Sequence, residues 1–190
     1  IDGITTFTKT LVGTEFDDAF NGATDAVIGE LVTYRLTVSF PEGTTPNAVI
    51  LDTLDNGLAF VGQTASSLND VSISGSLTPT ISGNGRTVTW DFGTVTDSNL
   101  SNNTDGSITV EYQAVVLNVT GNQAGTALDN SAVFSWNNDP ATEITRDATD
   151  VVVREAHVEV SKSVQVNAPS GATTGDAGDA VEYTIVIQNT

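Results

Sequence analysis

The chain of 190 residues is strongly acidic, with 24 acidic and 6 basic residues and a formal net charge of -18. Such a charge repels phosphate backbones, and no apolar run approaches the roughly 20 residues that span a bilayer, so we expect neither nucleic-acid binding nor membrane insertion. The sequence holds no cysteine, which removes disulfides as a source of stability. It also begins without methionine, which predicts a processed or excised piece of a longer protein.

The predicted elements are all β-strands. Segments rich in Val, Ile, Thr, Phe and Tyr alternate with period two, whereas Gly, Asn, Asp and Ser fill the gaps between them. No segment of helical length shows a period of 3.6 with matching caps. The pattern predicts an immunoglobulin-like Greek-key β-sandwich. In chain order, the expected strands are residues 4–12, 27–40, 47–54, 57–64, 69–75, 77–82, 86–95, 106–119, 126–137 and 149–153.

An internal repeat divides the chain. The segment VEVSKSV at 158–164 echoes residues 5–11, and GDAVEYT near the end echoes GELVTYR at 29–35. The only two lysines, Lys9 and Lys162, occupy the same position of the two copies. We therefore predict a complete repeat over residues 1–153, followed at 154–190 by the first two strands of a second tandem copy or by strands donated to a neighbour.

Three polar residues, Lys9, Asp52 and Asn130, lie on the face of their predicted strands that otherwise carries apolar side chains. Phe7 and Leu11, for example, flank Lys9 in its row. A buried ammonium without a partner is costly, and so is a buried carboxylate or amide. We expect the three side chains to meet in the core, because each needs hydrogen bonds that only the others supply there.

This combination of residues permits a reaction within the protein. Burial lowers the pKa of a lysine and raises that of an aspartate, which gives a neutral amine beside a protonated acid. Asp52 can then polarise the carboxamide of Asn130 and pass a proton to the departing ammonia, leaving an amide between Lys9 and Asn130. Glu30 is the alternative acid if Asp52 faces solvent. Without reaction, the three residues would form a buried salt bridge with an amide neighbour.

The same residues carry a resemblance to a known family. A lysine on the first strand, an aspartate within ILDTLDNGLAF and an asparagine on the last strand resemble the isopeptide-forming domains of bacterial fimbrial proteins and of collagen-adhesin-type surface repeats. The segments GELVTYRLTV and GDAVEYTIVIQNT are similar to the G-[DE]-x-V-x-Y strand of those repeats. The resemblance covers residues 5–137 and restarts at about residue 156. It implies an immunoglobulin-like domain of a large bacterial surface protein.

The acidic loop at residues 14–25 offers oxygen ligands for calcium from Asp17, Asp18 and Asp25. It lacks the ligand spacing of an EF-hand loop, and a solvated acidic loop is the alternative. His157 is the only histidine, so neither a zinc site nor a Ser-His-Asp triad of usual composition is expected. We expect no cofactor other than, at most, calcium.

These observations predict a non-enzymatic structural repeat of an extracellular fibre, stalk or adhesin at the cell surface. Its partners would be neighbouring repeats of the same protein, including a homopolymeric fibre. The first alternative is a fibre subunit joined to its neighbour by strand addition through residues 156–190. The second is an adhesin module that binds a ligand or cation through the end loops at 13–26 and 97–106. The only catalysis expected is the single-turnover formation of the amide.

Overall fold

The computed structural model describes residues 6–17, 21–99, 104–155, 158–167 and 172–189. It divides into two compact units, Ile1–Arg154 and Glu155–Thr190. This division lies one residue from the predicted boundary. No helix in the described ranges is long and apolar enough to cross a membrane.

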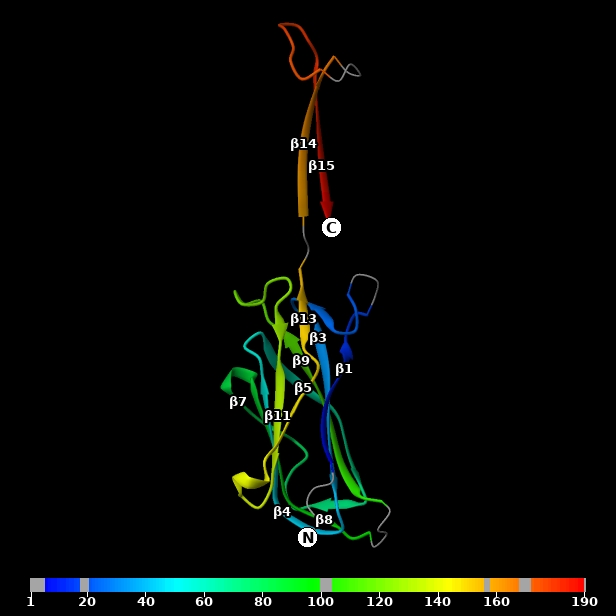
Figure 1. The fold of residues 1–190 in the computed structure, drawn as a ribbon, viewed down its shortest axis with the longest axis vertical. Helices are drawn as coiled ribbons and strands as arrows, with labels where there is room; N and C mark the ends of the chain where they lie inside the picture. The colour runs from blue at the N-terminus through cyan, green and yellow to red at the C-terminus, as the bar shows by residue number, and fades with distance from the viewer. Residues whose placement is uncertain (1–5, 18–20, 100–103, 156–157, 168–171, 190) are drawn as a thin grey trace. The chain divides into compact units, whose positions relative to one another are not determined.

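The first unit is built around two sheets that face each other (Figure 1). The first sheet has four antiparallel strands in the order β1-β3-β9-β5. Their bounds are β1 Thr6–Thr14, β3 Leu31–Phe40, β9 Gly106–Val116 and β5 Leu58–Asn69. The second sheet has the order β12-β11-β4-β8-β6, with β7 also paired to β8. Its strands are β12 Ile144–Asp147, β11 Asn130–Ser135, β4 Gly43–Leu54, β8 Thr87–Asp97, β6 Val71–Ile73 and β7 Thr80–Ser82.

Short elements complete the first unit. A small sheet of order β10-β13-β2 joins β10 (Ala127–Leu128), β13 (Val151–Arg154) and β2 (Asp25–Val27), with β13 and β2 parallel. The only helical elements among the described residues are the 3-10 turns η1 (Gly83–Gly85) and η2 (Pro140–Thr142). Because strands that follow each other in sequence, such as β3 and β4, lie in different sheets, the chain crosses repeatedly between layers. The predicted immunoglobulin-like β-sandwich is confirmed.

The core lies between the two sheets and consists of the alternate residues of each strand whose side chains point inward. The residues on the inward face of each strand are mostly buried, although Leu11 and Trp136 are only half-buried. Aromatic rings contact one another across this core, as in the pair Phe7 and Phe134, whose centroids are 5.8 Å apart. The buried residues of these faces include Val32, Tyr34, Leu36, Val38, Val88, Trp90, Phe92, Ile108, Val110, Tyr112, Ala114, Val116, Leu128, Ala132 and Phe134.

Two differences from the predicted strands have a common cause. The predicted strand 57–64 continues to Asn69 as β5, the predicted strand 69–75 is the shorter β6, and β12 was not predicted at all. The second half of β5 is exposed. β12 lies at the edge of its sheet, where only Ile144 is half-buried and the other residues are exposed. A strand without a buried face shows no alternation in sequence, so it gives no periodic signal.

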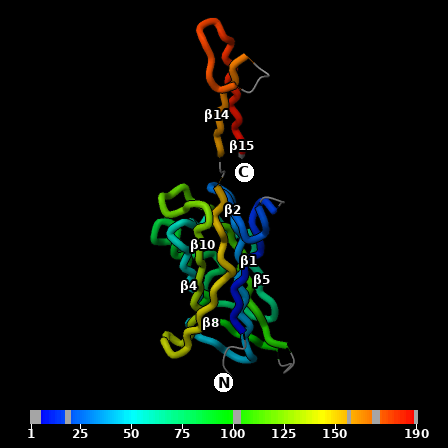
Figure 2. Tube along the Cα trace, turned by 45° about the horizontal axis from the view of Figure 1, so that its top comes forward, coloured from blue at the N-terminus to red at the C-terminus, as the bar shows by residue number. Residues whose placement is uncertain are grey.

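The first strand lies beside the end of the repeat. In Figure 2 the blue β1 runs next to the yellow segment that contains β12. Arg146 on β12 donates a hydrogen bond of 3.0 Å from Nε to the backbone oxygen of Phe7 on β1. The edges of the two sheets therefore approach each other at β1, and a side chain of β1 that points inward meets residues of β11 and β4.

The second unit is an antiparallel pair, β14 (Val158–Val166) and β15 (Val181–Asn189). Its strand register is that of β1 and β3. Lys9 pairs with the residue two positions after Tyr34, and Lys162 pairs with the residue two positions after Tyr183. Each lysine also lies over the ring of its tyrosine, with Nζ 5.6 Å and 4.4 Å from the ring centroid respectively. The repeat seen in the sequence is thus also a repeat of strand pairing.

Candidate functional site: a buried lysine, aspartate and asparagine between the sheets

The two sheets contribute different members of the site. Lys9 lies on β1 of the first sheet, whereas Asp52 on β4 and Asn130 on β11 lie in the second. Asp52 pairs with Ala132, and Asn130 pairs with Leu54, so Asp52 and Asn130 are diagonal neighbours on one face. All three side chains point into the core, and the whole residues are 5%, 0% and 1% exposed.

The three predicted residues are in direct contact. Nζ of Lys9 donates a hydrogen bond of 2.6 Å to Oδ1 of Asp52, and the two side chains are fully inaccessible. The same Nζ donates to Oδ1 of Asn130. The amine is therefore held between the carboxylate and the carboxamide, in a place that water does not reach.

Tyr112 on β9 completes the hydrogen bonding of the site. Its hydroxyl donates to Oδ2 of Asp52 at 2.8 Å and accepts from Nδ2 of Asn130 at 2.8 Å. The four side chains thus form a closed ring of hydrogen bonds. Sequence reasoning gave Tyr112 no role, although alternation along its strand places it on the inward face. The residue type could have indicated this role, because a buried tyrosine, unlike a phenylalanine, needs a hydrogen-bond partner for its hydroxyl.

Burial dominates the electrostatics of the site. It lowers the pKa of Lys9 from 10.5 to about 8, although the charge and hydrogen bond of Asp52 act in the opposite direction. It raises the pKa of Asp52, against the opposing effects of Lys9 and of the Tyr112 hydroxyl. Because a charge costs more free energy in the core than in water, the two shifts reduce the free-energy difference between two states of the site. In one state Lys9 and Asp52 are both charged, and in the other both are neutral.

Aromatic rings surround these groups and keep the site dry. Tyr34 and Trp90 each lie with their ring centroid 5.6 Å from that of Tyr112, and Phe60 lies at 5.7 Å. The hydroxyl of Tyr34 is buried and, within the described structure, makes no hydrogen bond. Burial raises the pKa of Tyr34, and the nearby carboxamide of Asn130 acts against that rise.

Glu30, the alternative acid, is buried but makes its contacts elsewhere. Its carboxylate accepts hydrogen bonds from the backbone nitrogens of Phe16 and Val27 and from Nδ2 of Asn21, at 2.8 to 2.9 Å. It therefore anchors the loop between β1 and β3. The carboxylate that contacts Lys9 is that of Asp52.

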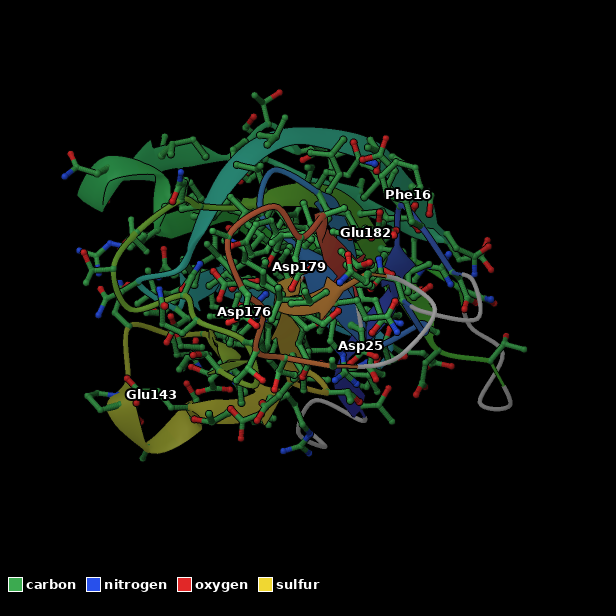
Figure 3. All side chains as sticks on the ribbon, turned by 90° about the horizontal axis from the view of Figure 1, so that it is seen from above. Phe16, Asp25, Glu143, Asp176, Asp179 and Glu182 are labelled. Atoms are coloured by element: carbon green, nitrogen blue, oxygen red, sulfur yellow. The ribbon has the colours of Figure 1, made fainter. Side chains whose placement is uncertain are left out.

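The calcium candidates do not form a cluster among the residues that the structure describes. Asp25 forms an ion pair of 2.9 Å with Arg154, and Asp17 is exposed. No group of three or more His, Cys, Asp or Glu residues in the described ranges is arranged to hold a metal ion. Asp18 lies outside those ranges, so calcium binding in this loop stays a prediction. Figure 3 marks Asp25 and Phe16, of which the latter is 54% exposed.

No family model matches the sequence, and the curated proteins give no match either. Among solved structures, the major pilin subunit BcpA of Bacillus cereus is similar over 97% of this chain and 55% of that one, with 14% identity and a TM-score of 0.49. Domains D2 and D3 of the major pilin SpaD from Corynebacterium diphtheriae are similar over 91% of this chain and 57% of that one, with 20% identity and a TM-score of 0.47.

A third similar structure is ACE19, the collagen-binding subdomain of the Enterococcus faecalis surface protein ACE. It is similar over 75% of this chain and 95% of that one, with 13% identity and a TM-score of 0.43. The chain spans a little over half the length of the two pilin structures. The three similar structures are thus two major pilins and one collagen-binding subdomain of a surface protein.

Proposed function

We propose that the first unit is a structural, non-enzymatic repeat of an extracellular surface fibre, stalk or adhesin, stabilised by an amide between Lys9 and Asn130 that the fold itself produces. The observation that carries this function is the buried contact of Lys9 with both Asp52 and the carboxamide of Asn130. An enzyme that acts on outside substrates needs an accessible site. These three side chains are enclosed in the core, so the reaction that they support is directed at the protein itself.

The reaction exchanges one amine for another on the carboxamide of Asn130. Neutral Lys9 attacks Cγ with its lone pair, the C–Nζ bond forms, and electrons move to the carboxamide oxygen. The C=O bond then forms again, the C–Nδ2 bond breaks, and ammonia leaves after gaining one proton. Nζ keeps a single proton, and Asp52 gives up one proton and recovers another. Because the sandwich holds the amine against one carboxamide, its effective concentration is very high.

The product would tie the two sheets together where β1 and β11 approach each other. Lys9 and Asn130 are 121 positions apart in the sequence. Tension applied to the ends of the repeat would pass from β1 through the amide into β11, so the residues between them would not be pulled. This is the property that a repeat in a surface fibre requires. The charge of -18 also keeps neighbouring fibres apart at moderate salt.

The second unit fits the start of a further copy. Lys162, Val164, Tyr183 and Ile185 share one face of the β14–β15 pair, as Lys9 and its neighbours do in β1 and β3. The face is largely apolar, and Tyr183 and Ile185 are each 60% exposed. A pair of strands does not bury such a face by itself. In a tandem array the covering sheet belongs to the same repeat, and in the alternative function these two strands join a sheet of a neighbouring subunit by strand addition.

The intact mass of the denatured chain tests the cross-link. We expect a mass lower than that of the sequence by one ammonia, and a proteolytic peptide in which the segments around Lys9 and Asn130 are joined. Lys9→Met, which keeps a long apolar side chain in the core, should restore the full mass of its own sequence.

Lys162→Met is the matched control, because it changes the only other lysine of the chain. That variant should still lack one ammonia. A wild-type chain with its full sequence mass would refute self-catalysed cross-linking and leave Lys9 as a buried partner of Asp52.

The pH dependence of stability tests the electrostatics in a chain that does not react. In Asn130→Ala, Lys9 stays titratable, with a pKa of about 8 in the folded state and 10.5 when unfolded. Between these values the unfolded chain binds more protons, so the free energy of unfolding should rise with pH, by up to about 3 kcal/mol. Urea unfolding between pH 8 and pH 9, where about 1 kcal/mol of this rise is expected, avoids most of the ionisation of unfolded tyrosines, whose usual pKa is about 10.

The wild-type chain provides the comparison, because an amide nitrogen does not titrate in this range. Its stability should lack the rise that Lys9 causes. Adding Lys9→Met to Asn130→Ala should abolish the rise in the same way. An equal rise in the double variant would assign the effect to other groups.

A further inference from the structure

No hydrogen bond joins the acid and the leaving nitrogen of the proposed reaction in the described structure. Oδ1 of Asp52 accepts from Lys9, and Oδ2 accepts from the hydroxyl of Tyr112. Nδ2 of Asn130, the atom that must leave as ammonia, donates to that same hydroxyl. Within the described structure, the hydrogen-bonded path from the carboxyl of Asp52 to this nitrogen therefore passes through Tyr112.

We propose that Tyr112 is a catalytic residue of the cross-linking reaction, whose hydroxyl relays a proton from Asp52 to the departing nitrogen of Asn130. This role rests on the cross-link proposed above. A hydroxyl suits it because it donates one hydrogen bond and accepts others. Both of its contacts are 2.8 Å long, and the residue is 0% exposed, so no bulk water competes for the transfer.

The protons balance in a single concerted transfer. In the reactive state Lys9 is neutral, and the carboxyl of Asp52 carries its proton on Oδ2, facing the tyrosine. After the attack, Nδ2 of Asn130 is a pyramidal amine with a free lone pair, so it accepts from the hydroxyl to which it previously donated. Nζ then gives a proton to Oδ1, Oδ2 gives its proton to the tyrosine, and the hydroxyl proton moves to Nδ2.

At the end of this transfer ammonia has left, and every other group has its original number of protons. Asp52 is again a neutral acid, and Tyr112 is again a phenol. Burial raises the pKa of Tyr112 well above its usual value. The hydroxyl therefore does not stay ionised, and it releases its proton only as it receives another.

Tyr34 offers a matched comparison within the same site. Its ring lies 5.6 Å from that of Tyr112, and both residues are fully buried. The carboxamide of Asn130 lies close enough to the Tyr34 hydroxyl to lower its pKa, but this hydroxyl forms no hydrogen bond to Asp52 and has no partner in hydrogen-bonding geometry in the described structure. Replacing either tyrosine by phenylalanine removes one buried oxygen atom, but only Tyr112→Phe interrupts the path from Asp52 to Asn130.

The test follows the loss of ammonia by intact mass in the full chain, made in a short pulse of cell-free synthesis and then diluted into buffer. Tyr112→Phe should react about a hundredfold more slowly than the wild type, the usual scale for the loss of one proton-transfer group. Tyr34→Phe should react at the wild-type rate. Circular dichroism of each variant verifies that its sandwich has formed.

A second measurement separates proton relay from simple positioning. The wild-type rate, plotted against the deuterium fraction of the solvent, should be curved, because several protons move together. In Tyr112→Phe the plot should be straight. Equal rates in Tyr112→Phe and the wild type, or a straight plot for the wild type, would overturn the relay alone. A wild-type chain that never loses ammonia would overturn the cross-link itself.

Discussion

Removing the cross-link should lower the stability of the first unit by about 5 kcal/mol, the largest effect that we expect from a single substitution outside the apolar core. Asn130→Ala keeps Lys9 and Asp52 but leaves no carboxamide to attack. The amide would close a loop of 121 positions. In the chain-entropy treatment of cross-links, a loop of this size reduces the freedom of the unfolded chain by about 5 kcal/mol at 25 °C.

For a unit of this size, that loss corresponds to a fall of about 10–20 °C in Tm, which differential scanning calorimetry measures directly. The substitution also removes the hydrogen bonds of a buried side chain, so a control must account for them. Asn122→Ala provides it. Asn122 is 3% exposed and donates to the backbone oxygens of Gly57 and Leu117, but it lies in a different part of the sandwich and takes no part in the reaction.

Asn122→Ala should lower the free energy of unfolding by about 1–3 kcal/mol, the cost of leaving buried groups without partners. The excess loss in Asn130→Ala is then the contribution of the amide. Equal losses in the two variants would mean that no cross-link stabilises the wild-type chain.

Replacing Asp52 should stop the reaction while Lys9 and Asn130 stay in place. In Asp52→Ala no group takes the proton from Lys9 or returns one to the leaving nitrogen, so we expect the rate to fall by about 100-fold to 10,000-fold. Alanine is preferable to asparagine here, because asparagine would add a second carboxamide beside the amine. Intact mass after expression should show the full sequence mass, and Asn130 should be recovered unmodified in peptide maps.

Glu30→Gln tests the other acid that the sequence offered. Glu30 is 2% exposed, and it anchors the loop between β1 and β3 rather than contacting Lys9. Its replacement should weaken that loop, yet the chain should still lack one ammonia. The reverse pattern, a cross-link in Asp52→Ala and none in Glu30→Gln, would assign the acid role to Glu30.

Much of this fold follows from periodicity alone. An alternating strand in a sandwich buries one face, and moving a residue by one position would take it from core to solvent. The alternation of residues along each strand therefore predicted its inward face. It placed Lys9, Asp52 and Asn130 on that face because each stands between apolar neighbours of its own strand. The repeat of the lysine and tyrosine positions was equally visible, since it depends only on spacing along the chain.

Alternation along a strand predicts the face on which a side chain lies, but not the residues that it contacts across the core. The contact of Lys9 with Asp52 depends on β1 lying at the edge where its sheet approaches β11 and β4, which is a property of the packing of two sheets. The sequence left Glu30 as the alternative acid, in case Asp52 faced solvent. Only the tertiary structure separated them, by joining Glu30 to its own loop.

Tyr112 shows the same limit most clearly. In sequence it is one more aromatic residue in a core row, indistinguishable from Tyr34, with which it pairs across β3 and β9. The structure gives only one of these hydroxyls a place between the acid and the carboxamide. The sequence by itself determined which residues are inside, because burial acts on each strand separately. Which of them interact was decided by strand order and sheet packing, because those contacts join residues that are far apart in the chain.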